Sequence, residues 1–254
     1  MKIVLIGAGN LATNLGYALQ QAGHTITQVY SRTEASAASL ASLLHTPFTT
    51  SVSDVVREAD VFLVSVTDTA LPHIADEVLR GREGQFIVHT AGTMPMDTVH
   101  ARRRGVLYPM QTFSKQRLVN FHDIPIFVET SETDDREKLQ SLAESISERV
   151  YEVSSQDRKY IHLAAVFCCN FANHCYAMGE KLLTEHGVPF SVMLPLIEET
   201  AAKVRVMSPV SAQTGPAVRR DSNVMEAHMR LLADNPACQT LYQLMSEGII
   251  RLSK

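Results

Sequence analysis

A glycine-rich turn near the N-terminus carries the clearest chemical signal in the sequence. Residues 7–12 read GAGNLA, directly after the apolar run 3–6 and directly before an amphipathic stretch. Gly7 permits a tight turn and Gly9 lets a diphosphate approach the backbone, while the following helix start offers free N–H groups to phosphate. The turn therefore predicts a dinucleotide site that includes Gly7, Gly9, Asn10, Leu11 and Ala12. A simple strand-to-helix turn and the adenosylmethionine site of a methyltransferase are the alternatives.

The end of the second apolar run indicates which dinucleotide is bound. An NAD site usually carries Asp or Glu here, bonded to the ribose 2′-hydroxyl. The sequence instead reads YSRT over residues 30–33, and the nearest acid, Glu34, is expected in the first turn of the next helix. Arg32 can hold a 2′-phosphate in bidentate geometry, with the hydroxyls of Ser31 and Thr33 beside it. We therefore expect NADP, the alternative being that Arg32 is an ordinary surface arginine.

Small and polar residues follow three later strands, at the edge of the sheet where the ligands of such folds lie. The residues expected to line the nicotinamide half of the cofactor site are Ser65, Val66, Thr67, Thr90, Ala91 and Gly92, and those expected to contact substrate are Tyr108 and Gln111. Asp68 is expected either to line this site or to cap the next helix. His89 is expected to be structural rather than catalytic, and the three arginines at 102–104 to lie at a solvated helix end.

A helical pattern that begins near residue 157 contains the candidate catalytic residues. On a helix, four residues fall within about 60° of arc, with Asn170 on their flank: His162, Val166, Cys169 and Asn173. Histidine side chains commonly transfer protons in enzymes, so His162 is the candidate proton donor to a developing oxyanion or amide. Asn170 or Asn173 is expected to orient the substrate, on a buried helix that faces something polar. The alternative is a buried histidine with a structural role.

A polar loop at residues 214–221 (TGPAVRRD) is the second candidate substrate site. Long loops within compact domains are often functional, and Arg219 can grip a carboxylate or phosphate near Thr214. Asp221 and Ser222 can cap the following helix. The adjacent cysteines at 168 and 169 have no activating partner in the sequence and are expected to be core thiols.

The order of apolar runs and amphipathic stretches explains how these residues come together. Short runs rich in Val, Ile and Phe indicate strands covered on both faces, as in a parallel sheet. Strands are predicted at 3–6, 25–30, 61–66, 86–89, 106–108, 124–128 and 150–153. Helices are predicted at 11–22, 35–44, 71–79, 157–185, 191–206, 224–232 and 238–252, with 207–222 as a polar connection. The sequence therefore predicts a doubly wound, Rossmann-like α/β domain over residues 1–154 and a mostly α-helical domain over residues 155–254.

Composition limits the class of protein. The 254 residues are 45% apolar and 20% charged, with a net charge of −4. These values exclude a disordered or membrane-spanning chain, and no nucleic-acid or anionic-membrane partner is expected. The four cysteines lack both a CxxC pair and zinc-ligand spacing, so we expect no metal and a reduced, cytoplasmic location. The apolar run at the N-terminus is interpreted as a buried strand and not as a signal peptide.

Several segments together resemble a known family. The glycine turn, residues 89–92 (HTAG), residues 108–113 (YPMQTF) and residues 214–216 (TGP) with Arg219 and Asp221 look like the NADP oxidoreductases of the deazaflavin-dependent-like group. Their superfamily includes 6-phosphogluconate dehydrogenase, ketopantoate reductase and pyrroline-5-carboxylate reductase. The resemblance implies a Rossmann-like domain followed by a helical domain whose first helix leans over the nicotinamide. It also implies a homodimer in which the helical domains pair.

Two departures from the family pattern bear on the reaction. Relatives usually carry His where this chain has Tyr108, and the Lys-x-x-x-Asn pair of hydroxyacid dehydrogenases is absent, because Leu163 stands four residues after Lys159. We expect an NADP-dependent oxidoreductase that transfers a hydride between NADPH and a small carbonyl, imine or hydroxyacid substrate. The alternative is a non-catalytic NADP(H)-binding redox sensor or regulatory protein.

Overall fold

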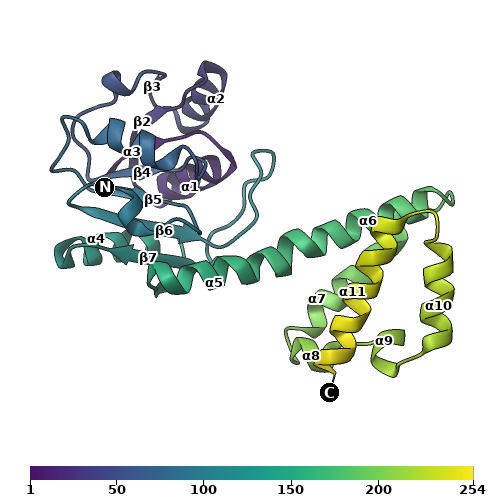
Figure 1. Cartoon of the computed structure of the whole chain (residues 1–254). Coiled ribbons are helices and arrows are strands. Elements are labelled where there is room, and N and C mark those ends of the chain that lie inside the picture. The colour runs from purple at the N-terminus through teal and green to yellow at the C-terminus, as the bar shows by residue number, and fades with distance from the viewer. Residues whose placement is uncertain (254) are drawn as a thin grey trace. The chain divides into compact units, whose positions relative to one another are not determined.

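One eight-stranded sheet organises the N-terminal part of the chain in the computed structural model, which describes residues 1–253. Its strand order is β3-β2-β1-β4-β5-β6-β7-β8 (Figure 1). The strands are β1 (Lys2–Ile6), β2 (Thr25–Tyr30), β3 (Phe48–Thr49), β4 (Val61–Val64), β5 (Ile87–His89), β6 (Arg104–Pro109), β7 (Ile126–Thr130) and β8 (Val150–Glu152). The predicted doubly wound α/β fold is confirmed. The sheet is not wholly parallel, however, because β7 pairs antiparallel with β6 and parallel with β8.

Helices cover both faces of this sheet, because its central strands are apolar on both faces. Three helices pack on one face and α3 on the other: α1 (Asn10–Gln21), α2 (Glu34–Leu44), α4 (Thr133–Glu144), and opposite them α3 (Leu71–Leu79). Successive side chains of a strand point to opposite faces. In β1, Ile3 and Leu5 accordingly join the core under α1, whereas Val4 and Ile6 join the core under α3.

The rest of the described chain is helical, as the sequence predicts. Its helices are α5 (Ser155–Ala165), α6 (Ala172–Thr184), α7 (Leu194–Lys203), α8 (Pro209–Ala212), α9 (Pro216–Arg219), α10 (Ser222–Leu231) and α11 (Pro236–Leu252). A π-helical segment, Val166–Phe171, joins α5 to α6, and 3-10 turns occur at Val52–Asp54, Met96–Thr98 and Phe190–Met193. The chain forms two compact units, Met1–Asn170 and Phe171–Lys254. The first unit therefore includes α5 in addition to the predicted sheet domain of residues 1–154.

Some elements differ from the sequence-based expectation. The pattern does not predict α4, because its buried Leu139, Leu142 and Ala143 are sparsely spaced among charged residues. Residues 207–222, expected as a polar connection, contain α8 and α9. Asp221 does cap α10, since its carboxylate accepts a hydrogen bond from the Val224 N–H at 3.3 Å. None of the helices within residues 1–253 is long and apolar enough to cross a membrane.

Helix α5 is less buried than the sequence suggests. Arg158 is its one buried residue among those described, and the Leu163 side chain is 52% exposed. Cys168 is exposed and Cys169 is half-buried, so the expectation of core thiols is wrong for the single chain. The helix is held to the sheet by a few polar contacts, those of Ser155 and Arg158 with Glu129 and that of His162 with Tyr108.

The arginines at 102–104 do not lie at a helix end, contrary to the prediction. Arg104 begins β6, and its guanidinium pairs with the Asp97 carboxylate at 2.6 Å. Arg103 pairs with the buried carboxylate of Asp135 in α4 and lies 5.8 Å from the ring centre of Phe86. These contacts hold α4 and β6 together and give the arginines a structural role.

Candidate functional site

The glycine turn is shaped to receive a phosphate group. Gly7 has a φ of 117°, and a Cβ placed on it would lie 2.1 Å from the Ser65 carbonyl oxygen. No side chain is therefore tolerated there. Gly9 is the N-cap of α1 and has open space where a side chain would stand. Neither a side-chain cap nor an acidic residue occupies the first turn of α1, so its N–H groups and dipole are available to an anion.

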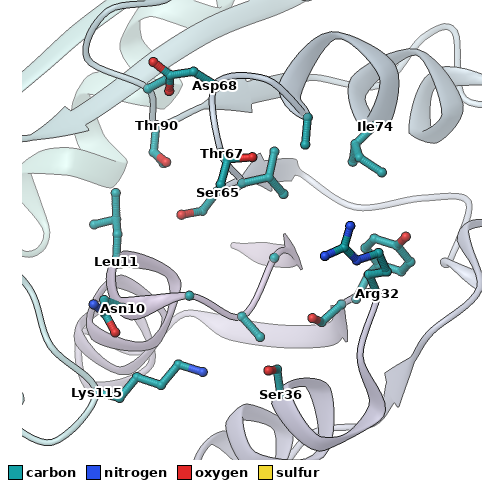
Figure 2. A pocket seen from close by; sticks show the side chains of 18 of the residues that line it. Asn10, Leu11, Arg32, Ser36, Ser65, Thr67, Asp68, Ile74, Thr90 and Lys115 are labelled. Carbon is teal, nitrogen blue, oxygen red and sulfur yellow. The ribbon is translucent and has the colours of Figure 1, made fainter.

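A cavity of about 650 Å³ lies in front of this turn (Figure 2). Twelve of the predicted cofactor residues line it: Gly7, Gly9, Asn10, Leu11, Ser31, Arg32, Ser65, Val66, Thr67, Thr90, Ala91 and Gly92. Ala12 does not line the cavity, because it is fully buried in the core between α1 and the sheet. Thr33 does not line it either, because it lies at the N-cap of α2. The sequence reasoning does not identify the lining residues Ala8, Tyr30, Ser36, Ala70, Ile74 and Lys115.

The charges around this cavity are unevenly distributed. Among its described lining residues, the basic side chains are Arg32 and Lys115, and the acidic side chain is Asp68. Asp68 does not cap α3, whose N-cap is Ala70, but accepts a hydrogen bond from the Thr93 hydroxyl. At the end of β2, where an NAD site would carry an acid, the exposed Arg32 guanidinium stands beside the cavity. This charge pattern suits a phosphorylated ribose better than a free 2′-hydroxyl.

A second cavity, of about 780 Å³, adjoins the first. The two share Asn10 and Leu11 in their walls. The predicted residues Tyr108, Gln111, His162 and Asn170 line the second cavity, together with the unpredicted Met110, Thr112, Phe113, Phe127, Ile161, Ala164, Ala165, Val166, Cys168 and Cys169. None of these described lining residues is Asp, Glu, Lys or Arg. The cavity therefore has mainly apolar walls with a few neutral polar groups.

Tyr108 and His162 form a pair in the wall of the second cavity, next to Gly92 of the first. The Tyr108 hydroxyl and His162 Nδ1 are hydrogen-bonded at 3.1 Å, and the Tyr108 ring stacks on Phe127 at 6.2 Å between ring centres. A Cβ on Gly92 would lie 2.6 Å from His162 Nδ1 and 2.8 Å from Tyr108 Cζ. Gly92 also lines the first cavity. Because it has no side chain, Tyr108 and His162 can lie directly against the backbone of that cavity's wall.

The environment of Tyr108 keeps its phenol protonated. Burial raises the pKa of Tyr108 above its ordinary value of 10, and the positive charge of Arg158 opposes part of that rise. A protonated phenol bonded to an imidazole can deliver a proton at neutral pH. The sequence reasoning names both residues, but it assigns Tyr108 to substrate and not to a pair with His162.

A buried ion pair fixes the helix that carries His162. Arg158, whose side chain is 1% exposed, lies one helical turn before His162 and donates to the Glu129 carboxylate of β7 at 2.6 Å. Its other terminal nitrogen donates to the Met94 carbonyl at 2.6 Å. The Ser155 N–H donates to the same Glu129 at 2.9 Å. These bonds tie the start of α5 to the sheet, a role that no local sequence signal indicates.

His89 lies inside the sheet and lines neither cavity. Its ring is fully buried in β5, and its Nδ1 accepts a hydrogen bond from the Ala91 N–H at 3.2 Å. Burial lowers the pKa of His89 from 6.5 to about 4, and the nearby charge of Arg158 adds to the shift. The imidazole is therefore neutral at pH 7 and shapes the loop that carries Thr90 and Gly92.

Three predicted site residues belong to the second unit. Asn173 lies in α6, Thr214 precedes α9, and Arg219 ends α9. Thr214 and Arg219 are exposed. Their participation in the site stays a prediction. Within residues 1–253 no group of three or more His, Cys, Asp or Glu side chains could hold a metal ion.

Comparison with known proteins places this geometry in a family. Residues 1–109 match the model of a Rossmann-like domain, and residues 124–249 match a domain of unknown function, DUF2520. A solved structure from Bacteroides fragilis, described as a "putative NADP oxidoreductase", is 51% identical, with 98% of each chain covered and a TM-score of 0.94. The chain belongs to the same family as this Bacteroides protein, with a Rossmann-like domain followed by a DUF2520 domain. Family membership confirms the predicted resemblance to NADP oxidoreductases and the oxidoreductase class.

More distant structures share the fold of the family. A protein from Thermotoga maritima is 22% identical, with 99% of each chain covered and a TM-score of 0.84. An imine reductase from Myxococcus stipitatus, solved with NADP+, is 17% identical, with 98% of this chain and 93% of that chain covered and a TM-score of 0.68. A search of curated protein sequences found no match.

Proposed function

We propose that the chain reduces a C=N or C=O bond of a small, uncharged substrate with NADPH. One observation carries the proposal: two cavities share Asn10 and Leu11, and the Tyr108–His162 pair lines the second cavity next to Gly92 of the first. The first cavity has the features of a dinucleotide site, and the second has room for a substrate beside a proton donor.

The first cavity fits NADPH by its backbone and by its charge. The turn at Gly7 and Gly9 and the uncapped start of α1 would receive the diphosphate. Arg32, with the Ser31 hydroxyl, would hold the 2′-phosphate. The description of the Bacteroides relative as an NADP oxidoreductase supports the same cofactor. When bound, NADPH supplies the hydride.

The Tyr108–His162 pair would supply the proton. The phenol is held between the ring of Phe127 and His162 Nδ1, and burial keeps it protonated. Its proton passes to the nitrogen or oxygen that gains negative charge, and His162 stabilises the phenol oxygen through their hydrogen bond. Asn170 lines the same cavity and can orient the substrate. Tyr108 thus takes the place in which relatives usually carry His.

The walls of the second cavity favour a neutral substrate. A bound carboxylate needs a cation, and the described lining residues of this cavity include no Lys or Arg. A neutral imine or ketone with an apolar carbon skeleton can bind in this cavity without burying an unpaired charge. A hydroxyacid would need a cation from elsewhere, for which Arg219 is the candidate, with the Thr214 hydroxyl as a further polar contact.

We also propose that two copies associate through the second unit. Large apolar side chains are exposed there in the single chain, among them Leu196 at 63%, Val206 at 80% and Leu231 at 83%. Exposed apolar residues in this number mark an association surface more often than a free one.

A binding experiment tests the cofactor. NADPH, NADH and adenosylmethionine are titrated into the pure protein by calorimetry, with Arg32→Ala and, as a matched control, the exposed Arg57→Ala. We expect NADPH to bind tightest and Arg32→Ala to weaken it about 10- to 100-fold, because a charge-assisted contact to phosphate is lost. Arg57→Ala is expected to bind like wild type. Absence of heat with NADPH would contradict the proposal.

A turnover experiment then separates an enzyme from a sensor. Oxidation of NADPH is followed with a panel of cyclic imines and ketones, and reduction of NADP+ is followed with hydroxyacids, using wild type, Tyr108→Phe and His162→Ala. We expect turnover of neutral imines or carbonyls, and a loss of about 100-fold or more in kcat in both variants, because each removes part of the proton donor. Tight NADPH binding without turnover on any substrate would favour the redox sensor.

A further inference from the structure

The loop between β6 and β7 crosses the start of α1 and is held there by one buried side chain. Asn14 of α1 is 1% exposed, and its Nδ2 donates to the Ser114 carbonyl at 3.0 Å and to the Asn10 carbonyl at 2.9 Å. Its Oδ1 accepts from the Val119 N–H at 3.0 Å. One carboxamide therefore ties two points of the loop to the helix whose N-terminus faces the cofactor cavity.

The ends of this loop are fixed as well. Phe113 stacks on Phe121 with 5.6 Å between ring centres, and Phe121 is buried in the core. Ser114 and Arg117 form a β-bridge, so the segment between the two Asn14 contacts folds into a tight turn. A turn held at its base in this way keeps its direction, because few backbone torsions remain free.

Lys115 occupies the part of the turn that faces the cavity. It directly follows Ser114, it is exposed, and it lines the cofactor cavity. Figure 2 shows its side chain extending from the loop toward the space between Asn10 and Ser36. Within residues 1–253, Lys115 forms no ion pair with an acidic side chain. The other cation of the cavity, Arg32, lies in the segment that follows β2.

We propose that Lys115 forms an ion pair with a phosphate group of the bound dinucleotide and that Asn14 is the positioning residue that holds it there. The inference rests on the proposed binding of NADPH. A phosphate placed against the uncapped start of α1 or near Ser36 lies within the part of the cavity that Lys115 faces. The loop thereby contributes to cofactor affinity although it is about 100 residues away in sequence from the glycine turn.

The test compares two variants of this loop, Lys115→Gln and Arg117→Gln, each of which replaces one cation by a neutral side chain. Lys115→Gln is expected to weaken NADPH binding about tenfold in calorimetry at low salt. Arg117→Gln removes a cation two residues away that does not line the cavity, and it is expected to bind NADPH like wild type. The difference between Lys115→Gln and wild type is expected to shrink as salt rises, because screening weakens the ion pair.

A parallel titration with NADH shows which phosphate group Lys115 contacts, because NADH has the diphosphate but lacks the 2′-phosphate. If Lys115 contacts the diphosphate, Lys115→Gln weakens NADH and NADPH by the same factor. If it contacts the 2′-phosphate, only NADPH is weakened. Wild-type affinity for both nucleotides in Lys115→Gln, or an equal loss in Arg117→Gln, overturns the inference while leaving NADPH binding intact. Failure of wild type to bind NADPH would instead overturn the proposed function.

A double-mutant cycle tests the role of Asn14. Asn14→Leu removes both bonds that tether the loop, together with the bond to Asn10, and is expected to weaken NADPH binding nearly as much as Lys115→Gln. In the Lys115→Gln background the same change is expected to have little further effect, because the lysine that it positions is gone. Additive losses would show that Asn14 acts independently of Lys115. If Asn14→Leu lowers the Tm by so much that binding cannot be measured, the comparison of Lys115→Gln with Arg117→Gln decides the inference.

Discussion

The two units differ in how they bury apolar residues. In the first unit, the sheet separates two cores, and side chains such as Leu63 and Val88 are completely covered. In the second unit, the buried apolar residues within the described chain are Ala217, Leu232 and Cys238, whereas Val206 and Leu231 are mostly exposed. The first unit is thus built to fold on its own core. The second unit buries few of its own apolar side chains within the single chain.

The largest expected effect comes from removing a core side chain of the first unit. Leu63→Ala, in the central strand β4, is expected to lower the free energy of unfolding by about 3 kcal/mol, because the strand is covered on both faces and the cavity cannot collapse. Leu231→Ala is the matched change in the second unit and is expected to cost less than about 0.5 kcal/mol. Hydrogen exchange measured by mass spectrometry reports the two units separately. Equal losses in the two variants would remove the contrast.

Acid is expected to weaken the first unit through His89. The unfolded chain takes up a proton near pH 6.5, whereas burial lowers the pKa of His89 to about 4 in the folded unit. Stability is therefore lost as pH falls from 6.5 toward 4, by about 2 kcal/mol at pH 5 relative to pH 7. His89→Gln should reduce this slope in urea unfolding followed by circular dichroism, whatever its effect at pH 7. An unchanged slope would show that other groups dominate.

Polar substitution on the second unit should change assembly more than folding. Leu196→Ser combined with Val206→Ser is expected to weaken self-association at least about tenfold, or about 1.4 kcal/mol, because apolar contact area is lost. Sedimentation equilibrium measures the change. Leu43→Ser, in α2, alters a partly exposed leucine of the first unit and serves as the control. A monomeric wild type would contradict the proposed dimer.

The smallest expected effect concerns the second unit's share in substrate binding. Arg219→Gln is expected to raise KM about threefold for substrates that carry a carboxylate, because an exposed ion pair contributes little. KM for neutral imines or ketones should not change. Arg220→Gln, the neighbouring exposed arginine, is the matched control in steady-state kinetics. A rise for neutral substrates would show that Arg219 acts on the protein and not on the anion.

Local signals account for the way in which most of the predicted cofactor residues come together. The glycine turn, the bounds of β2 and the polar ends of β4 and β5 follow from short segments in which residue type and position are directly related. Consequently most of the predicted cofactor residues line one cavity. The two that do not, Ala12 and Thr33, contribute to packing and to the start of α2.

Contacts between distant segments account for what the sequence does not show. The Asn14 tether joins residues about 100 positions apart, and the Arg158–Glu129 pair joins α5 to β7, so no spacing rule reveals either. The pairing of Tyr108 with His162 depends on Gly92, whose local role in the sequence is only that of a small residue. Helix α4 is missed for a different reason, since its charged surface hides its short apolar stripe.

The placement of aromatic residues gives the chain an optical reporter of its own. It has seven tyrosines and no tryptophan, so its ultraviolet emission comes from phenol rings. Tyr30 lies in the wall of the cofactor cavity and Tyr108 in that of its neighbour. A reduced nicotinamide ring absorbs in the range in which tyrosine emits, and its arrival should quench that signal by energy transfer. Occupancy can then be followed in the native protein without a label.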